Sequence, residues 1–90
     1  GKLPREVFSE SYSMEYGEST LELHRDDMPV GSRILILDDV LATGGTLGAA
    51  ARLIRKAGAE VAGFGVVLEL GDLGGRDRLG DTPVTALIAY

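Results

Sequence analysis

The chain has no cysteine, a single histidine (His24) and only two lysines among its 90 residues. Without cysteine it has neither disulfide bonds nor thiolate metal ligands. His24 has no paired cysteine or second histidine, so it is a poor candidate for a metal ligand. The sequence also lacks a signal peptide and an apolar run of membrane-spanning length. These absences leave binding or catalysis by carboxylates, hydroxyls and backbone groups as the chemistry to look for.

Acidic residues outnumber basic ones by 14 to 9, which gives a net charge of −5. This balance argues against a surface for nucleic acid or for an anionic membrane, so we expect neither as a partner. To bind an anionic ligand, the protein would need a local source of positive charge, such as a helix N-terminus, an isolated basic side chain or a metal ion. The hydrophobic content of 44% is that of a globular chain, and the length corresponds to one domain or part of one.

Residues 7–24 carry an alternating apolar and polar pattern. It predicts two strands, residues 7–16 and 20–24, that are joined by a turn at residues 17–19 into a β-hairpin. Residues 34–37 are apolar without interruption, which is typical of a central parallel strand that is covered on both faces.

The second half of the chain alternates helix and strand patterns. Helical spacing over residues 46–57, ended by Gly58, is followed by an apolar segment at residues 61–70. Together with the preceding strand this predicts a right-handed, parallel strand–helix–strand unit, and therefore an α/β fold. Residues 72–79 predict a short helical turn, and residues 84–90 predict a last strand.

An acidic pair, Asp38 and Asp39, directly follows the apolar run. In open α/β sheets, ligands bind beyond the carboxyl ends of the strands. Carboxylates accept hydrogen bonds from a vicinal diol, and they also hold Mg²⁺ through water. Because successive side chains of a strand point to opposite faces, both aspartates can reach one ligand only if the strand ends there.

Residues 42–46, Ala-Thr-Gly-Gly-Thr, place small side chains and free N–H groups at the start of the predicted helix. This arrangement favours an anion-binding cradle. It is not a P-loop, because the spacing differs and no lysine follows the second glycine, and it is not a dinucleotide-binding glycine loop. The alternative is that the aspartates cap the helix and the glycines only make a turn. The strand, the acidic pair and the TGGT loop together favour a site for a phosphate and a ribose.

Four separate segments resemble one enzyme family. ILILDDVLATGGT is similar to the phosphoribosyl pyrophosphate motif of type I phosphoribosyltransferases. GKLPRE, SYSMEYGESTLELHRD and LELGDLGGRDRL resemble the adenine phosphoribosyltransferases within that family. The resemblance implies a partial, Rossmann-like parallel-sheet core in residues 33–90 and a β-hairpin lid segment in residues 1–24. These would form a single domain, the C-terminal part of a phosphoribosyltransferase domain.

The resemblance implies an enzyme of purine salvage that converts adenine and 5-phosphoribosyl 1-pyrophosphate to AMP and pyrophosphate. It also implies Mg²⁺ as cofactor, a cytoplasmic location, and a homodimer when the chain is full length. The family's pyrophosphate-binding loop and part of its base pocket have no counterpart here, and the chain starts with Gly1 in loop-like sequence. We therefore expect a missing N-terminal part and little activity from these residues alone. The alternative is a non-catalytic regulatory module that binds phosphoribosyl pyrophosphate, or an inactive fragment.

The resemblance also assigns roles to individual residues. Asp38 and Asp39 would bind the ribose hydroxyls and stabilise the cationic sugar. Glu15 would be the acid/base group at adenine N7, and Tyr16 would belong to the mobile lid. Lys2 would approach the pyrophosphate. Leu70 would lie against the purine ring. The 5-phosphate would be held by Ala42, Thr43, Gly44, Gly45 and Thr46.

Spacing alone gives some of these residues an ordinary structural reading. Glu15 would be an exposed strand glutamate, and Tyr16 a hairpin packing residue. Glu69 at the end of a predicted strand has no evident partner. The charged residues that follow it are typical of a solvated charged turn; they are Asp72, Arg76, Asp77 and Arg78.

Overall fold

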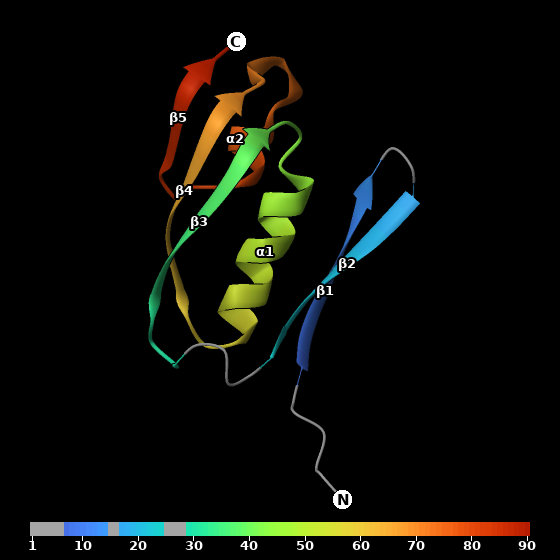
Figure 1. Ribbon diagram of the computed structural model, residues 1–90, viewed down its shortest axis with the longest axis vertical. Helices are drawn as coiled ribbons and strands as arrows, with labels where there is room; N and C mark the ends of the chain where they lie inside the picture. Colours follow the sequence, from blue (N-terminus) through green and yellow to red (C-terminus); the bar gives the residue numbers. More distant parts are fainter. Residues whose placement is uncertain (1–6, 15–16, 25–28) are drawn as a thin grey trace, which may run out of the picture.

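The computed structural model describes residues 7–14, 17–24 and 29–90. A three-stranded sheet, a helix and a hairpin lie side by side in it (Figure 1). The sheet has the order β3 (Arg33–Leu41), β4 (Glu60–Glu69), β5 (Val84–Ala89), and both neighbouring pairs are parallel. Helix α1 (Gly45–Lys56) connects β3 to β4. The predicted α/β fold with a parallel strand–helix–strand unit is confirmed.

The hairpin consists of β1 (Val7–Met14) and β2 (Gly17–His24), which pair antiparallel with Met14 opposite Gly17. The hairpin itself was predicted, but the turn expected at residues 17–19 was wrong. Those residues belong to β2, and Ser19 pairs with Tyr12. An alternating pattern indicates that two segments are strands, but it does not fix where their ladder of hydrogen bonds ends.

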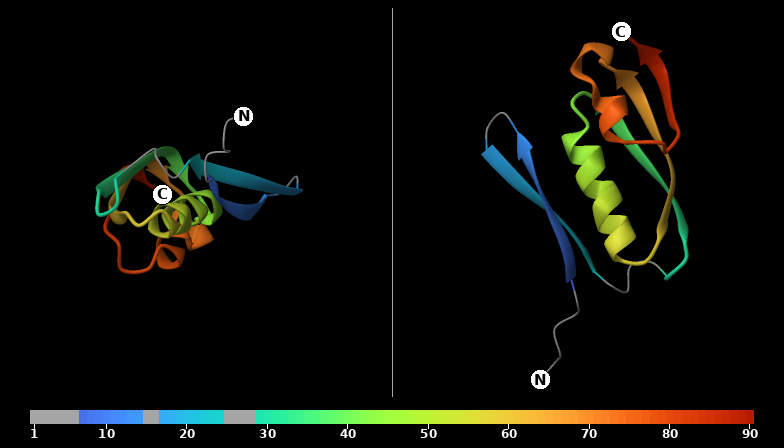
Figure 2. Two further views of the ribbon diagram at one scale, coloured as in Figure 1. Left: turned by 90° about the horizontal axis from the view of Figure 1, so that it is seen from below. Right: turned by 180° about the vertical axis from the view of Figure 1, so that it is seen from behind.

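Helix α1 lies between the sheet and the hairpin and is buried on two sides (Figure 2). Leu47, Ala51 and Ile54 pack on the sheet in the main hydrophobic core, whose centre is Phe64 with only 1% exposure. Leu53 is also buried but does not belong to that cluster. We attribute its burial to the hairpin, because α1 contacts β1 more extensively than it contacts any other element.

Charged contacts tie the hairpin to α1. The Glu10 carboxylate on β1 lies 3.0 Å from Lys56 Nζ and 3.4 Å from Arg52 Nε. Lys56 Nζ also donates to the Ser9 carbonyl at 3.1 Å. Lys56 is in the last turn of the helix, where positive charge also interacts favourably with the helix dipole.

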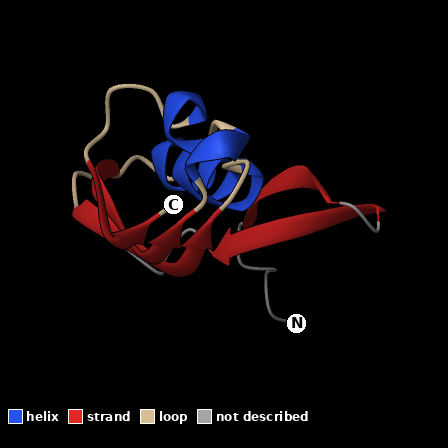
Figure 3. Ribbon diagram, turned by 90° about the horizontal axis from the view of Figure 1, so that it is seen from above, coloured by secondary structure: helices blue, strands red, loops and turns tan. Residues whose placement is uncertain are grey.

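The helices cover only one face of the parallel sheet (Figure 3). On the other face Leu37 of β3 and Leu87 of β5 are 72% and 77% exposed, and they line a shallow apolar hollow with Val67. The expectation that residues 34–37 form a central strand covered on both faces is therefore wrong for the part of the chain that the structure describes. There β3 is an edge strand, and α1 supplies a layer on one side only.

The segment between β4 and β5 forms a short 3₁₀ turn, η2 (Gly71–Leu73), and a single helical turn, α2 (Gly75–Arg78). The helical turn predicted within residues 72–79 is thus confirmed. Across the described ranges, no helix is both long enough and apolar enough to cross a membrane.

Candidate functional site

The two aspartates lie within β3 rather than beyond it, because the strand continues to Leu41. Asp38 is half-buried and lines a cavity at the carboxyl end of the strand, while Asp39 is exposed and does not line it. Each carboxylate accepts a hydrogen bond from the next backbone N–H, from Asp39 at 2.8 Å and from Val40 at 2.9 Å. The pair is therefore divided between the two sides of the strand, and Asp38 is the carboxylate on the helix side.

Partial burial of Asp38 raises the pKa of its carboxyl above the ordinary value of 3.8. The neighbouring Asp39 carboxyl raises this pKa further by hydrogen bonding and like-charge repulsion, while the Asp39 N–H opposes the shift. A carboxylate in this setting is incompletely compensated. It gains most from a ligand that donates hydrogen bonds or carries positive charge.

The loop after β3 leads into α1 through Gly44, whose conformation other residues rarely adopt. Gly44 is buried and has φ +86°, in the left-handed region that favours glycine. Its carbonyl accepts the first helical hydrogen bond, from Gly48 N–H at 2.8 Å. The Gly45 N–H approaches Thr43 Oγ1 at 3.4 Å. The predicted glycine loop and helix start are confirmed in position.

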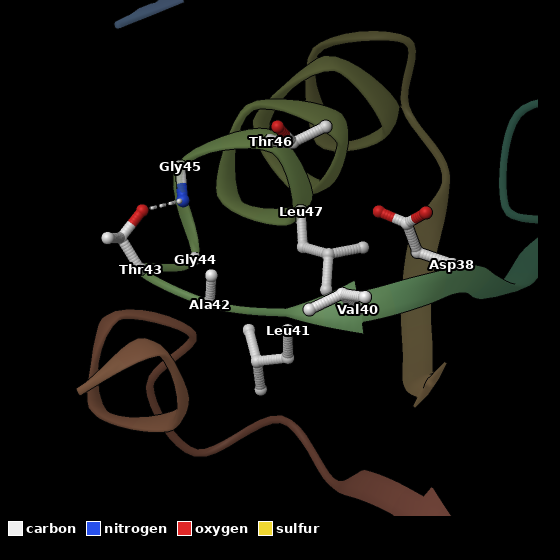
Figure 4. A pocket seen from close by; sticks show the side chains of 9 residues that line it. All are labelled: Asp38, Val40, Leu41, Ala42, Thr43, Gly44, Gly45, Thr46 and Leu47. Carbon is white, nitrogen blue, oxygen red and sulfur yellow. Dashed lines mark hydrogen bonds between the residues drawn. The ribbon is translucent and has the colours of Figure 1, made fainter. Parts of the chain in front are cut away.

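The N-terminus of α1 has features that suit an anion. The first turn has no acidic residue and Gly44 provides no side-chain cap, so the first backbone N–H groups carry an uncompensated partial positive charge. The residues of this first turn line a cavity of about 80 Å³, whose whole lining consists of residue 38 and residues 40–47. Figure 4 shows the Asp38 carboxylate and Thr46 on the same side of β3, at the first turn of the helix. Among the described residues that line it none is basic, so an anion here would be held by backbone N–H groups and by the hydroxyls of Thr43 and Thr46.

The cradle, residues 42–46, is backed by the segment between β4 and β5. Gly75 lies against the Ala42 carbonyl oxygen, and a β-carbon on Gly44 would stand 2.9 Å from the Gly75 carbonyl oxygen. Leu70, which directly follows β4, is half-buried, and its N–H donates to the Leu41 carbonyl at 2.9 Å. Leu70 is thus beside the cradle, although it does not line the cavity.

Sequence reasoning missed one charged pair. Glu69 is only 8% exposed, and it accepts two hydrogen bonds from Arg76, from Nε at 3.0 Å and from Nη2 at 2.6 Å. Arg76 Nη1 also donates to the Val84 carbonyl at 3.0 Å. Arg76 is exposed, as expected for a solvated charged turn, but the prediction did not include its pairing with Glu69. The available signal was a carboxylate at a strand end with an arginine seven residues later, after paired glycines.

Three expected site residues, Lys2, Glu15 and Tyr16, lie outside the described residues. β1 ends and β2 begins at the end of the molecule where α1 begins (Figure 1). Among the residues that the structure does describe, no three histidine, cysteine or acidic side chains gather as they would around a metal ion.

The comparisons with known proteins agree with this geometry. Residues 5–88 match the phosphoribosyl transferase domain family. A protein of Renibacterium salmoninarum named adenine phosphoribosyltransferase is 62% identical over 88 residues, which are 98% of this chain and 48% of that protein. The chain thus spans about half the length of this relative.

Solved structures show the same likeness. The adenine phosphoribosyltransferase of Thermoanaerobacter pseudethanolicus superposes with a TM-score of 0.88 and 42% identity, over 100% of this chain and 52% of that one. The Saccharomyces cerevisiae enzyme, in complex with an imino-altritol bisphosphate and adenine, superposes with a TM-score of 0.86 and 40% identity, over 97% of this chain and 49% of that one. The cradle and the aspartate beside it therefore belong to a known architecture, and the chain is a member of the phosphoribosyltransferase family.

Proposed function

We propose that the protein is an adenine phosphoribosyltransferase, which forms AMP and pyrophosphate from adenine and 5-phosphoribosyl 1-pyrophosphate. One observation carries this proposal. An open helix N-terminus and the Asp38 carboxylate share one cavity at the carboxyl end of β3. The chain that forms this cavity is 62% identical to a protein with that name.

The cradle, residues 42–46, binds the 5-phosphate of the sugar. Its backbone N–H groups and the dipole of α1 favour a dianion without any basic side chain. The hydroxyls of Thr43 and Thr46, both exposed at the cavity, add donors. This use of the main chain fits a protein whose net charge is −5.

Asp38 and Asp39 act on the ribose. As the bond between the anomeric carbon and the pyrophosphate oxygen breaks, positive charge develops on the sugar ring, and the bond to adenine N9 then forms. Carboxylates that bind the ribose hydroxyls stabilise that charge. Asp38 is better placed for this role than Asp39, because it lines the same cavity as the cradle.

The remaining roles fall on residues at the adenine and pyrophosphate ends. Glu15 exchanges a proton at adenine N7 while N9 loses its own proton. Tyr16 belongs to a lid that excludes water from the sugar cation. Lys2 approaches the pyrophosphate, and Leu70 packs against the purine ring.

Mg²⁺ is the expected cofactor, and it would neutralise charge on the leaving pyrophosphate. The donor set fits an ion that is held mainly by the substrate. The described residues offer no cluster of three acidic or histidine ligands, and Asp38 and Asp39 each already accept a backbone hydrogen bond. Asp38 would contact the ion through water.

The enzyme would act in purine salvage in the cytoplasm, and the full-length chain would form a homodimer. Sedimentation of the full-length protein with and without substrates tests the dimer. A single species of monomer mass under both conditions would contradict it.

The function is tested by incubating the purified full-length protein with adenine, phosphoribosyl pyrophosphate and Mg²⁺, and measuring AMP by chromatography. Guanine and hypoxanthine replace adenine in parallel reactions. We expect AMP formation that depends on adenine and disappears when a chelator removes the metal. Equal turnover of guanine would contradict the assignment of the base.

Binding measurements separate the enzyme from a regulatory module. Calorimetry with phosphoribosyl pyrophosphate and with ribose 5-phosphate reports occupation of the cradle without turnover. Saturable binding without any AMP formation would favour the regulatory module over the enzyme.

A further inference from the structure

Glu69 is a nearly buried carboxylate at the end of β4, directly before the segment that backs the cradle. It is paired with Arg76 through two parallel N–H···O bonds, which fix the plane of the guanidinium as well as its distance. The pairing lowers the pKa of Glu69 against the opposing effect of burial, so the carboxyl is ionised whenever the enzyme would work. The Arg76 side chain is thus bound to the end of β4.

The third contact of Arg76 reaches the next strand. Its Nη1 donates to the Val84 carbonyl at the start of β5. The guanidinium therefore joins the end of β4 to the beginning of β5, across the short segment that contains α2. A helix of four residues is not stable by itself. Its position depends on such tertiary contacts.

The helical turn that Arg76 fixes lies in contact with the cradle. Gly75, the first residue of α2, is packed on the Ala42 carbonyl oxygen with no room for a β-carbon. A β-carbon on Gly44 would stand 3.2 Å from the Arg78 β-carbon and 2.9 Å from the Gly75 carbonyl oxygen. The loop that connects β3 to α1 is therefore packed against the helical turn α2.

We propose that Glu69 and Arg76 are positioning residues for phosphate binding: their bidentate pair holds α2 against residues 42–44 and so sets the geometry of the cradle. The proposal rests on the proposed function, because it concerns the same site. Neither residue touches the ligand. The pair acts through Gly75 and the backbone of the cradle, where a small displacement changes the direction of every N–H group that faces the phosphate.

The test compares Arg76→Met, Arg76→Lys and Glu69→Gln in the full-length protein. We expect Arg76→Met to raise KM for phosphoribosyl pyrophosphate by about tenfold, as is common for residues that orient direct ligands. KM for adenine should change less, because Gly75 of α2 contacts the cradle, whereas Leu70, the residue proposed to pack on the purine ring, is held by its own hydrogen bond to the Leu41 carbonyl. Arg76→Lys should recover only part of the loss, since lysine keeps the charge but cannot form two parallel bonds.

The matched control is Arg33→Met. Arg33 Nε lies 3.7 Å from a carboxylate oxygen of Glu60, and both side chains are about 70% exposed. The two residues are the first of β3 and β4, so this pair is at the end of the sheet away from the cradle. Arg33→Met should leave both KM values unchanged. The proposal is overturned if Arg76→Met and Arg33→Met have the same KM for phosphoribosyl pyrophosphate, or if Arg76→Met changes the two KM values equally.

Binding of ribose 5-phosphate, measured by calorimetry, makes the test independent of catalysis. We expect about tenfold weaker binding to Glu69→Gln than to the parent protein, and this measurement also decides the matter if Arg76→Met does not fold. Unchanged binding would overturn the proposal. A parent protein that binds ribose 5-phosphate but makes no AMP would contradict the proposed enzyme activity, and the binding comparison would still decide the role of the pair.

Discussion

Gly75 lies directly on the carbonyl oxygen of Ala42, with no room between them for a β-carbon. Gly74, the preceding residue, has open space where a side chain would stand, but its φ of +70° lies in the left-handed region. Two neighbouring glycines are thus required for different reasons. Gly74 is required for its backbone conformation, and Gly75 for its contact with the cradle.

We expect Gly75→Ala to raise KM for phosphoribosyl pyrophosphate by about tenfold or more, because the cradle must move to admit the methyl group. Overpacking of this kind also costs about 1–3 kcal/mol of stability. Gly74→Ala is the control: it should cost about 1–2 kcal/mol through its left-handed backbone alone, with KM unchanged. Steady-state kinetics and thermal unfolding measure both effects. A similar rise of KM in the two variants would show that the contact is not specific to Gly75.

Asp38→Asn should lower kcat/KM by about a hundredfold, because the amide cannot stabilise positive charge on the ribose as a carboxylate does. Single-turnover AMP formation measures the effect on the chemical step. The exposed Asp72 provides the control variant, Asp72→Asn. A loss confined to KM for adenine would contradict the assignment of Asp38 to the sugar.

The same variant should be more stable than the parent at neutral pH, by less than about 1 kcal/mol for a largely solvated group. Burial raises the pKa of Asp38, so folding favours the neutral carboxyl. Its contribution to stability is complete below the ordinary value of 3.8 and is lost as the pH rises through the raised value. Thermal unfolding of parent and Asp38→Asn should therefore coincide near pH 3 and separate by pH 7. Separation in the reverse order would refute the burial argument.

Glu10→Gln should loosen the hairpin from α1. Its hydrogen bond to Lys56 and its pairing with Arg52 lower the pKa of Glu10, although burial opposes them. The contact is therefore present above the ordinary pKa of 4.5 and is lost as the pH falls through the lowered value. Hydrogen exchange at pH 7 should be roughly two- to fivefold faster in β1 and β2 of the variant, the size typical of a surface ion pair. Glu60→Gln should leave the exchange of the hairpin unchanged, and an equal effect of both variants would show that the Glu10 contact is not responsible.

The open face of the sheet predicts self-association of the 90-residue chain. Leu37 and Leu87 are among its most exposed apolar side chains, and contiguous apolar surface of this kind promotes contacts between molecules. Leu37→Thr together with Leu87→Thr should reduce concentration-dependent association in sedimentation experiments and change stability by less than about 1 kcal/mol. Val30→Thr, at a position that is 82% exposed outside this face, should have no effect on association. Undiminished association of the double variant would contradict the prediction.

The sequence was sufficient where local chemistry decides the structure. The apolar run before Asp38, the glycines at 44 and 45 and the helical spacing after them predict a strand, a turn and a helix. The helix lies within one residue of its predicted bounds, 46–57, but β3 continues four residues beyond the apolar run, from Leu37 to Leu41. The same segment predicts an anion-binding cradle at residues 42–46, because small residues and free N–H groups at a helix start are visible in the sequence. Phosphate binding there stays a prediction.

Contacts between distant segments could not be predicted in the same way. The second buried side of α1 depends on the hairpin, and the pairing of Glu69 with Arg76 depends on how one loop folds back on β4. The close approach of Gly75 to Ala42 joins residues 33 positions apart in the chain. Such features are set by tertiary packing, on which periodicity and propensity carry little information.

The cradle around Gly44 and Gly45 is built from peptide dipoles, and this has a consequence for the acid–base behaviour of the protein. A peptide N–H has no pKa in the range where the protein is folded, so the partial positive charge of the cradle is the same on both sides of neutrality. The Asp38 carboxyl, by contrast, titrates. Once the ionisation of the ligand's own phosphate is taken into account, affinity for a phosphorylated sugar should therefore separate into a part that is constant with pH and a part that follows the carboxyl groups at the ribose. Ligands without ribose hydroxyls, such as inorganic phosphate, would show only the constant part once their own ionisation is taken into account.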